Sequence, residues 1–143
     1  MKAKNLLFPH KAVQKNHSLL LLALRLFFGS LFMMHGYEKY INYATLRSTF
    51  PDPLSIGSEY SLILAIFGEL FCPLAFIFGF LYRLGLIPMI TTMSIAFFLT
   101  HHGSIKSGES ALVYLIIFIL AFLSGPGKYS FDYLIGKKSK SRR

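Results

Sequence analysis

The chain of 143 residues has one cysteine, no tryptophan and only six acidic residues. A single cysteine, Cys72, excludes an internal disulfide and a metal cluster built from cysteines, and we expect it to be a small packing residue. The sequence also lacks a nucleophilic triad, a phosphate-binding glycine loop and a dinucleotide fingerprint. The common signatures of hydrolases, phosphate-binding enzymes and dinucleotide-dependent enzymes are therefore absent.

Apolar residues, by contrast, make up 54% of the chain, and they occur in long blocks. The mean hydropathy of +0.54 is too high for an ordinary soluble domain. Four blocks are long enough for helices that cross a bilayer, at about residues 19–37, 60–80, 84–101 and 109–125. The sequence predicts an all-α fold, a polytopic membrane protein with a bundle of four transmembrane helices.

The fourth block is the weakest of these spans. Its uninterrupted apolar run covers only about 21 Å of a hydrocarbon core that is ~30 Å thick. We expect the helix to include Gly108–Ser110 at its start, and the alternatives are local thinning of the bilayer or a start at the interface.

Basic residues flank the apolar blocks. Four lysines precede the first block and six basic residues follow the last, so this side of the bundle, with Arg83, carries eleven Lys and Arg residues. The opposite side carries three, which are Lys39, Arg47 and Lys106. This excess of positive charge predicts that both termini are cytoplasmic, N-in and C-in. The tails indicate contact with anionic membrane lipids rather than nucleic acid, because no module that reads a groove or stacks bases accompanies them.

We therefore expect one membrane domain, residues 19–135, between basic cytoplasmic tails of residues 1–18 and 136–143. Near its end, Ser130 is a candidate N-cap of a helix at the membrane interface. The first block is predicted to be retained rather than cleaved as a signal peptide, since it contains Arg25 and lacks a small-residue cleavage site.

Glycine, proline and arginine mark three helix boundaries. Arg83 falls in a tight connection that makes the second and third spans antiparallel neighbours. Pro88 is expected in or near the first turn of the third span, where proline is tolerated. Gly125, Pro126 and Gly127 are expected to end the fourth span sharply.

Two charged residues lie deep inside the predicted spans, Arg25 in the first and Glu69 in the second. Small residues share a helix face with each, so both are predicted to face the bundle interior. Because an unpaired charge in the membrane costs ~3 kcal/mol or more, we expect a structural charge pair between them. The alternative is that Arg25 extends to the cytoplasmic interface while Glu69 stays protonated. Pro73 follows four residues after Glu69 and cannot donate the amide hydrogen bond that the Glu69 carbonyl normally accepts.

A second group of polar residues is predicted at the outer ends of the spans. Within it, the candidate catalytic residues are His35, Lys39, His101 and Glu109, as donors or acceptors of protons. A metal site is not predicted, because His101 and His102 point about 100° apart on a helix and no H-E-x-x-H spacing occurs. Two interpretations stay open: histidines that form hydrogen bonds at the interface, or a site for protons or a quinone.

Several of these residues form one ordered pattern: Arg25-x-x-x-Gly29, His35-Gly36-x-x-Lys39, Glu69, Gly79-x-x-x-Arg83, Gly108-Glu109 and Gly125-Pro126-Gly127-x-x-Ser130-x-Asp132. This pattern, over roughly residues 19–134, resembles the DoxX family of small membrane proteins with four spans. The resemblance implies a location in the bacterial cytoplasmic (inner) membrane. Members of the family are commonly labelled oxidoreductases, and the family is named from a subunit of a thiosulfate:quinone oxidoreductase.

The resemblance and the outer polar residues together favour a membrane subunit of a quinone-linked redox system, with no intrinsic cofactor and a quinone as its candidate ligand. Its activity, if enzymatic, is expected to be that of a quinone-linked oxidoreductase subunit. One alternative is a non-catalytic scaffold that recruits a soluble redox or stress enzyme, and another is a small proton-linked transporter. The expected partners are membrane lipids, a redox protein and a second copy of the chain.

Overall fold

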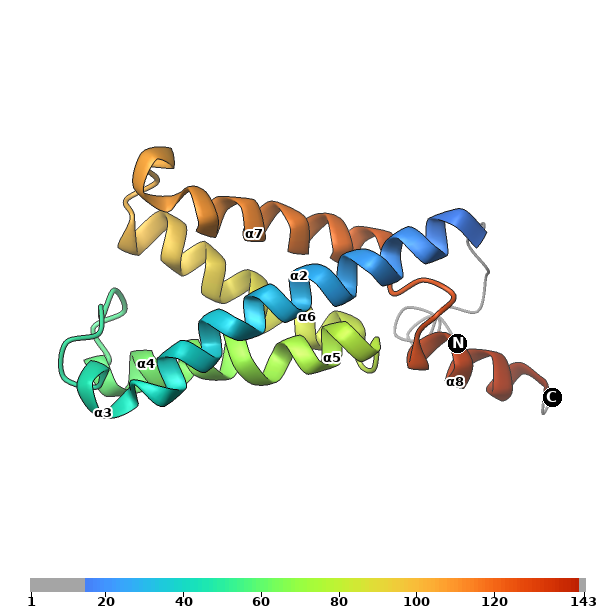
Figure 1. The fold of residues 1–143 in the computed structure, drawn as a ribbon, viewed down its shortest axis with the longest axis horizontal. Coiled ribbons are helices and arrows are strands. Elements are labelled where there is room, and N and C mark those ends of the chain that lie inside the picture. Colours follow the sequence, from blue (N-terminus) through green and yellow to red (C-terminus); the bar gives the residue numbers. More distant parts are fainter. Residues whose placement is uncertain (1–14, 142–143) are drawn as a thin grey trace.

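The computed structural model describes residues 15–141, and all regular structure in this range is helical (Figure 1). The first span is α2 (Lys15–Ile41), which extends beyond the predicted block of 19–37 at both ends. The predicted tails fall partly outside the described residues, at 1–14 and 142–143, while the last residues of the first tail belong to α2.

The remaining spans contain several helical segments. The second consists of α4 (Ser58–Ile66), the π-helix η1 (Phe67–Phe71) and α5 (Cys72–Phe78), and the third of α6 (Tyr82–Ser94) and the π-helix η2 (Ile95–Thr100). The fourth is α7 (Ile105–Ser124), and in the described part of the chain α3 (Tyr43–Leu46) and α8 (Phe131–Ser141) lie outside the spans.

Within residues 15–141, four helices are long and apolar enough to cross a membrane: His17–Ile41, Ser58–Phe78, Tyr82–Thr100 and Ile105–Ser124. The predicted all-α fold with four membrane-spanning helices is therefore confirmed. The chain is a multi-pass membrane protein.

The fourth span is longer than its apolar run indicated. α7 begins at Ile105, before the predicted start, and has 20 residues. Gly108 departs from helical dihedral angles (φ −111°, ψ 20°), so the helix opens with an irregular turn. At its other end, Gly125 has a φ of 82° and stops the helix, as predicted.

The connection between the second and third spans differs from the prediction. Gly79 ends α5 in the left-handed conformation (φ 65°), and Leu81 follows with a φ of 48°. Arg83 was predicted to lie in this connection, but it belongs to the first turn of α6, and its guanidinium stands over the ring of Phe122 at 5.6 Å. Pro88 lies inside α6 rather than in its first turn, because the helix begins earlier than predicted.

Wide helical turns interrupt the second and third spans. In η1 the amide of Cys72 bonds to the carbonyl of Phe67, five residues earlier, just before Pro73. Because this proline has no amide hydrogen, we expect an irregular pattern of backbone hydrogen bonds in the helix at this point. η2 ends in the same way, with the His101 amide bonded to the Ala96 carbonyl at 3.0 Å. Such π-turns are rare, and they occur frequently at functional sites.

α2 runs antiparallel to the second span and contacts it through glycines. A Cβ atom on Gly36 would lie 2.5 Å from the carbonyl carbon of Glu69, and one on Gly29 would lie 2.5 Å from Cγ1 of Ile77. The helices therefore approach closely at small residues, as is common between helices in membranes.

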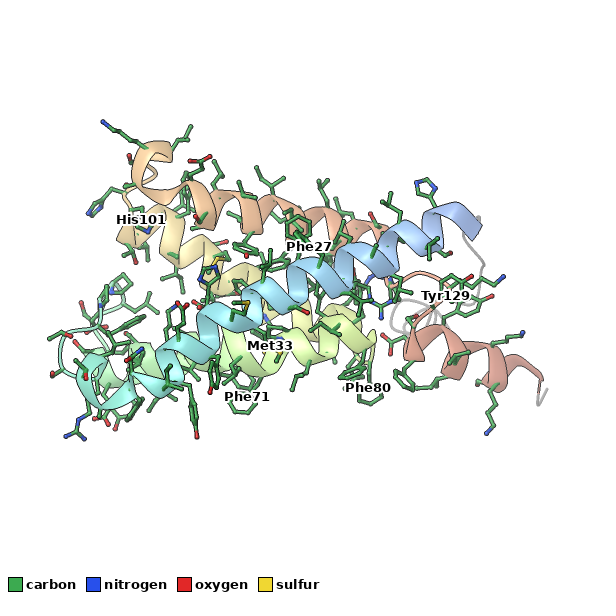
Figure 2. The ribbon with its side chains drawn as sticks, in the orientation of Figure 1. Phe27, Met33, Phe71, Phe80, His101 and Tyr129 are labelled. Atoms are coloured by element: carbon green, nitrogen blue, oxygen red, sulfur yellow. The ribbon has the colours of Figure 1, made fainter. Side chains whose placement is uncertain are left out.

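Aromatic side chains fill the space between α2, α5 and α7. Phe32, Phe76 and Phe118 are completely buried, and the Phe118 ring lies 4.8 Å from that of Phe32 and 5.6 Å from that of Phe76. In contrast, Phe71 and Phe80 point away from the bundle (Figure 2), where lipid would surround them.

α8 lies at the end of the bundle where α2 begins, which we call the α8 end (Figure 1). Asp132, which is 1% exposed, accepts hydrogen bonds from the amides of Leu81 and Tyr82, each at 2.9 Å. Its own amide donates to the Gly79 carbonyl. Ser130 is the N-cap of α8, as predicted, since its hydroxyl oxygen accepts a hydrogen bond from an amide in the first turn. The opposite end, with α3 and the loop that follows it, is the α3 end.

Candidate functional site

The predicted pair between Arg25 and Glu69 is wrong. Arg25 lies at the α8 end and is 2% exposed. Its guanidinium donates hydrogen bonds to four backbone carbonyls, at 3.0 Å to Phe76, 2.6 Å to Ile77, 2.8 Å to Pro126 and 2.9 Å to Tyr129. Two of these carbonyls are in the last turn of α5 and two follow α7, where carbonyls lack partners within a helix. A cation at helix C-termini is also favoured by the helix dipoles, so Arg25 serves as a structural lock.

Glu69 instead pairs with Lys39, with 2.5 Å between Oε2 and Nζ. The register of the helices explains this choice, because Gly36 lies against Glu69, and Lys39 is one turn further along the same face. Arg25, by contrast, lies roughly 16 Å along α2 from Gly36, the residue that contacts Glu69. The prediction failed because it paired Arg25 with Glu69 by their estimated depth and assigned Lys39 to the separate polar group at the outer ends of the spans. The spacing Gly36-x-x-Lys39 is the signal in the sequence that indicates the correct partner.

Lys39 and Glu69 line a cavity near the α3 end. The cavity has a volume of about 410 Å³, and its walls come from α2, from α4 with η1, from the end of the third span and from α7. His101, labelled in Figure 2, stands across the cavity from α4. The loop between α3 and α4 contributes Phe50, Pro51, Pro53 and Leu54. The volume is within the range of roughly 300–1,000 Å³ that is usual for small-molecule sites.

Polar groups gather on the side of the cavity formed by α2 and α7. The ring of His35 on α2 stands edge-on to that of Tyr114 on α7, with 5.8 Å between their centroids. Ser110 lies one turn before Tyr114 and also lines the cavity. Lys39 on α2 and Glu69 on the adjoining η1 add further hydrogen-bond donors and acceptors beside them. Further polar residues on the other walls are Ser61, Thr92, Thr100 and His101.

The rest of the cavity is apolar. The residues that form it are Phe32, Leu64, Ala65, Met93, Ile95, Ala96 and Ala111. A few polar groups set in mostly apolar walls are typical of sites that bind small organic molecules.

Three of the four candidate catalytic residues, His35, Lys39 and His101, line this cavity. The fourth, Glu109, is exposed on α7 and is not among the lining residues. Glu69, which the sequence suggested as a purely structural residue, does line it. Sequence reasoning also missed Tyr114 as a site residue, and its only signal was the spacing of one turn from Ser110.

The loop that contributes to the cavity is held by Asp52. Its carboxylate accepts hydrogen bonds from the amides of Ile56 at 3.0 Å and Gly57 at 2.7 Å, and from the hydroxyl of Ser61 at 2.7 Å. The bond from Ser61 and those from the backbone amides lower the pKa of Asp52 below its ordinary value. The loop is thereby tied to α4, one wall of the cavity.

The donor set favours proton chemistry rather than metal binding. Within residues 15–141, no group of three or more His, Cys, Asp or Glu side chains is arranged to hold a metal ion. Glu69 already accepts from the Lys39 ammonium, which has no lone pair to give to a metal. Ammonium, carboxylate and imidazole groups beside an apolar space can orient a polar ring and exchange protons with it.

Comparisons with known proteins agree with the pattern in the sequence. The profile of the DoxX family matches residues 20–102, which include the second and third spans, nearly all of the first, and the cavity residues that these spans provide. A Haemophilus influenzae protein, described as uncharacterized, is 30% identical over 126 residues, and the match covers 82% of this chain and 83% of that protein. No solved structure matches the chain at a significant level. The chain therefore belongs to the DoxX family.

Proposed function

We propose that this protein is a membrane subunit of a redox system and that its cavity binds the headgroup of a quinone. The observation that carries the proposal is the composition of the cavity, where Lys39, Glu69 and His35 lie beside aliphatic and aromatic walls. Membership of the DoxX family supports it, because the family resemblance implies a quinone-linked subunit.

The chemistry of quinone reduction explains why these side chains suit it. Reduction to a quinol takes two electrons and two protons, and one proton is added at each carbonyl oxygen. The Lys39 ammonium can donate a hydrogen bond to one of these oxygens, which stabilises the negative charge that develops as electrons arrive. His35 can deliver one of the two protons and the Lys39 ammonium the other, and Glu69 holds Lys39 in position through their ion pair.

The electrons are proposed to come from a partner protein that carries a flavin, a haem or an iron–sulfur centre. Cys72 is the only cysteine, so this chain has no dithiol that could donate two electrons. In this division of labour, the membrane subunit binds and protonates the quinone while its partner reduces it.

We place the protein in the inner membrane of a bacterium, with the α8 end toward the cytoplasm. The charge distribution supports this orientation, because the side with both tails carries most of the lysine and arginine residues. The cavity near the α3 end then lies in the outer half of the membrane.

The test is quinone binding by the purified protein in phospholipid nanodiscs, measured by displacement of a photoreactive ubiquinone analogue. Lys39→Met and Glu69→Gln each remove a charged hydrogen-bonding group from the cavity, which typically costs ~1.5–3 kcal/mol, so affinity should fall about tenfold or more. Glu38→Gln is the matched control, because Glu38 is exposed next to Lys39 and does not line the cavity.

Two results would contradict the proposal. One is wild-type labelling that excess unlabelled quinone does not displace. The other is unchanged affinity in both Lys39→Met and Glu69→Gln. Glu109→Gln adds a further check, since the position of Glu109 outside the cavity predicts wild-type affinity for this variant.

A further inference from the structure

The cavity has two sides of different character. Between α2 and α7 the lining carries the polar side chains of His35, Ser110 and Tyr114 beside the apolar Phe32 and Ala111, and His35 and Ser110 are exposed. Between α4 and η2, the polar lining residues Ser61 and Thr100 lie toward the α3 end. One turn further inside, α4 contributes the apolar Leu64 and Ala65 and η2 the apolar Ile95 and Ala96, before the polar Thr92 of α6.

The side between α4 and η2 opens to the surroundings of the bundle. Leu64 lines the cavity and is nevertheless 54% exposed. Ile95 and Ala96 are partly exposed as well, and the short side chain of Ala96 leaves room between the two helices. The neighbouring surface consists of exposed apolar residues such as Ile63 and Phe98, so in a membrane this opening faces hydrocarbon.

We infer that this opening holds the apolar tail of a lipid-soluble ligand whose polar ring lies against Lys39 and Glu69. The inference rests on the proposed function and narrows it to one substrate class, quinones with a long isoprenoid or alkyl tail. A cavity of about 410 Å³ is near the lower limit for small-molecule sites and takes a substituted ring without a long chain, so the chain must leave it. The opening between α4 and η2 offers the chain an apolar route, whereas a route between α2 and α7 would pass the polar groups of His35, Ser110 and Tyr114.

The experiment places a larger side chain in the opening. Ala96→Phe fills it, whereas Leu99→Phe puts the same side chain on η2 at an exposed position that does not line the cavity. Both variants and the wild type are compared in nanodiscs, by displacement of the photoreactive ubiquinone analogue. The competitors are a dimethoxybenzoquinone with a decyl tail and the same ring with a methyl group in place of the tail.

The wild type and Leu99→Phe are expected to bind the decyl quinone at least about tenfold more tightly than the tailless ring. Ala96→Phe is expected to lose this preference and to keep its affinity for the tailless ring within about twofold. If Ala96→Phe does not fold, Leu64→Phe blocks the opening from α4, with Ile63→Phe as its exposed control outside the cavity.

Three results would overturn the inference. If the blocked variants keep the preference for the decyl tail, the tail lies elsewhere. If they lose affinity for both competitors equally, the opening is part of the ring site, and the proposed function stands without the tail. If the wild type binds neither competitor, the proposed function fails and the inference fails with it.

Discussion

Gly36 lies against the backbone of Glu69 so closely that a Cβ atom at residue 36 would be 2.5 Å from the Glu69 carbonyl carbon and 2.6 Å from the Leu70 nitrogen. Both contacts are with backbone atoms, which cannot move aside as the end of a flexible side chain can. This contact sets the distance between α2 and η1, and it places Lys39, one turn after Gly36, against the Glu69 carboxylate.

Replacement of this glycine should therefore separate the two helices. Gly36→Ala is expected to lower the free energy of unfolding by about 1–3 kcal/mol, the usual range for an overpacked contact, and to weaken the pair between Lys39 and Glu69. Thermal unfolding in detergent measures the effect. Ser30→Ala is the control, because Ser30 is exposed on the same helix. Equal melting temperatures for the two variants would show that the contact is not tight.

The ion pair between Lys39 and Glu69 should show energetic coupling. Lys39→Met leaves the Glu69 carboxylate buried without its partner and is expected to cost about 3–5 kcal/mol. Adding Glu69→Leu removes the uncompensated carboxylate, so the double variant should be more stable than Lys39→Met alone. The measurement is a double-mutant cycle by reversible unfolding in mixed micelles. A double variant whose loss equals the sum of the two single losses would exclude a direct interaction.

Arg25 should resist even conservative replacement. Lysine has three donors, so Arg25→Lys leaves at least one of the four carbonyls without its hydrogen bond, at a cost of ~1.5–3 kcal/mol. We expect faster amide hydrogen exchange in the Gly79–Tyr82 turn and at the start of α8, read by mass spectrometry. Arg47→Lys in the exposed loop is the control and should leave exchange unchanged. Wild-type exchange at both segments in Arg25→Lys would contradict the structural lock.

Much of the fold follows from local patterns in the sequence. The four apolar blocks predict the four spans, and Gly125 and Ser130 act at helix ends as their residue types indicate. The boundaries were less accurate because the ends of helices depend on tertiary contacts. Arg83, for example, belongs to α6 because Asp132 accepts hydrogen bonds from amides at the start of that helix, from fifty residues further along the chain.

The partners of the buried charges could not be predicted from depth alone. The interpretation of Arg25 and Glu69 as a pair assumed that a cation in a membrane seeks a carboxylate, whereas four convergent carbonyls satisfy Arg25. The cavity is lined by residues from α2, η1, η2 and α7, and no local pattern in the sequence indicates which residues of different helices face one another. Pro73 did indicate an irregular backbone beside Glu69, but it did not indicate a π-helix.

The loop at the α3 end should respond to acid. Because the pKa of Asp52 is lower in the folded protein than its ordinary value, the stabilisation that it provides is present above that ordinary value. It is lost as the pH falls through the lowered pKa. Protection of the Ile56 and Gly57 amides, corrected for intrinsic exchange, should therefore decrease in acid. Asp52→Asn should lack this pH dependence, and a wild-type loop whose protection does not change with pH would contradict the assignment.

The carbonyl cluster around Arg25 also has a consequence for the order in which the protein is assembled. Arg25 enters the membrane with the first span, yet two of its partners, Pro126 and Tyr129, lie 101 and 104 residues later. During synthesis, Arg25 therefore cannot form all four of its hydrogen bonds until most of the chain has been made. A nascent chain that stops after α7 would hold a guanidinium with half of its acceptors, and such a chain should be a preferred substrate for membrane quality-control proteases.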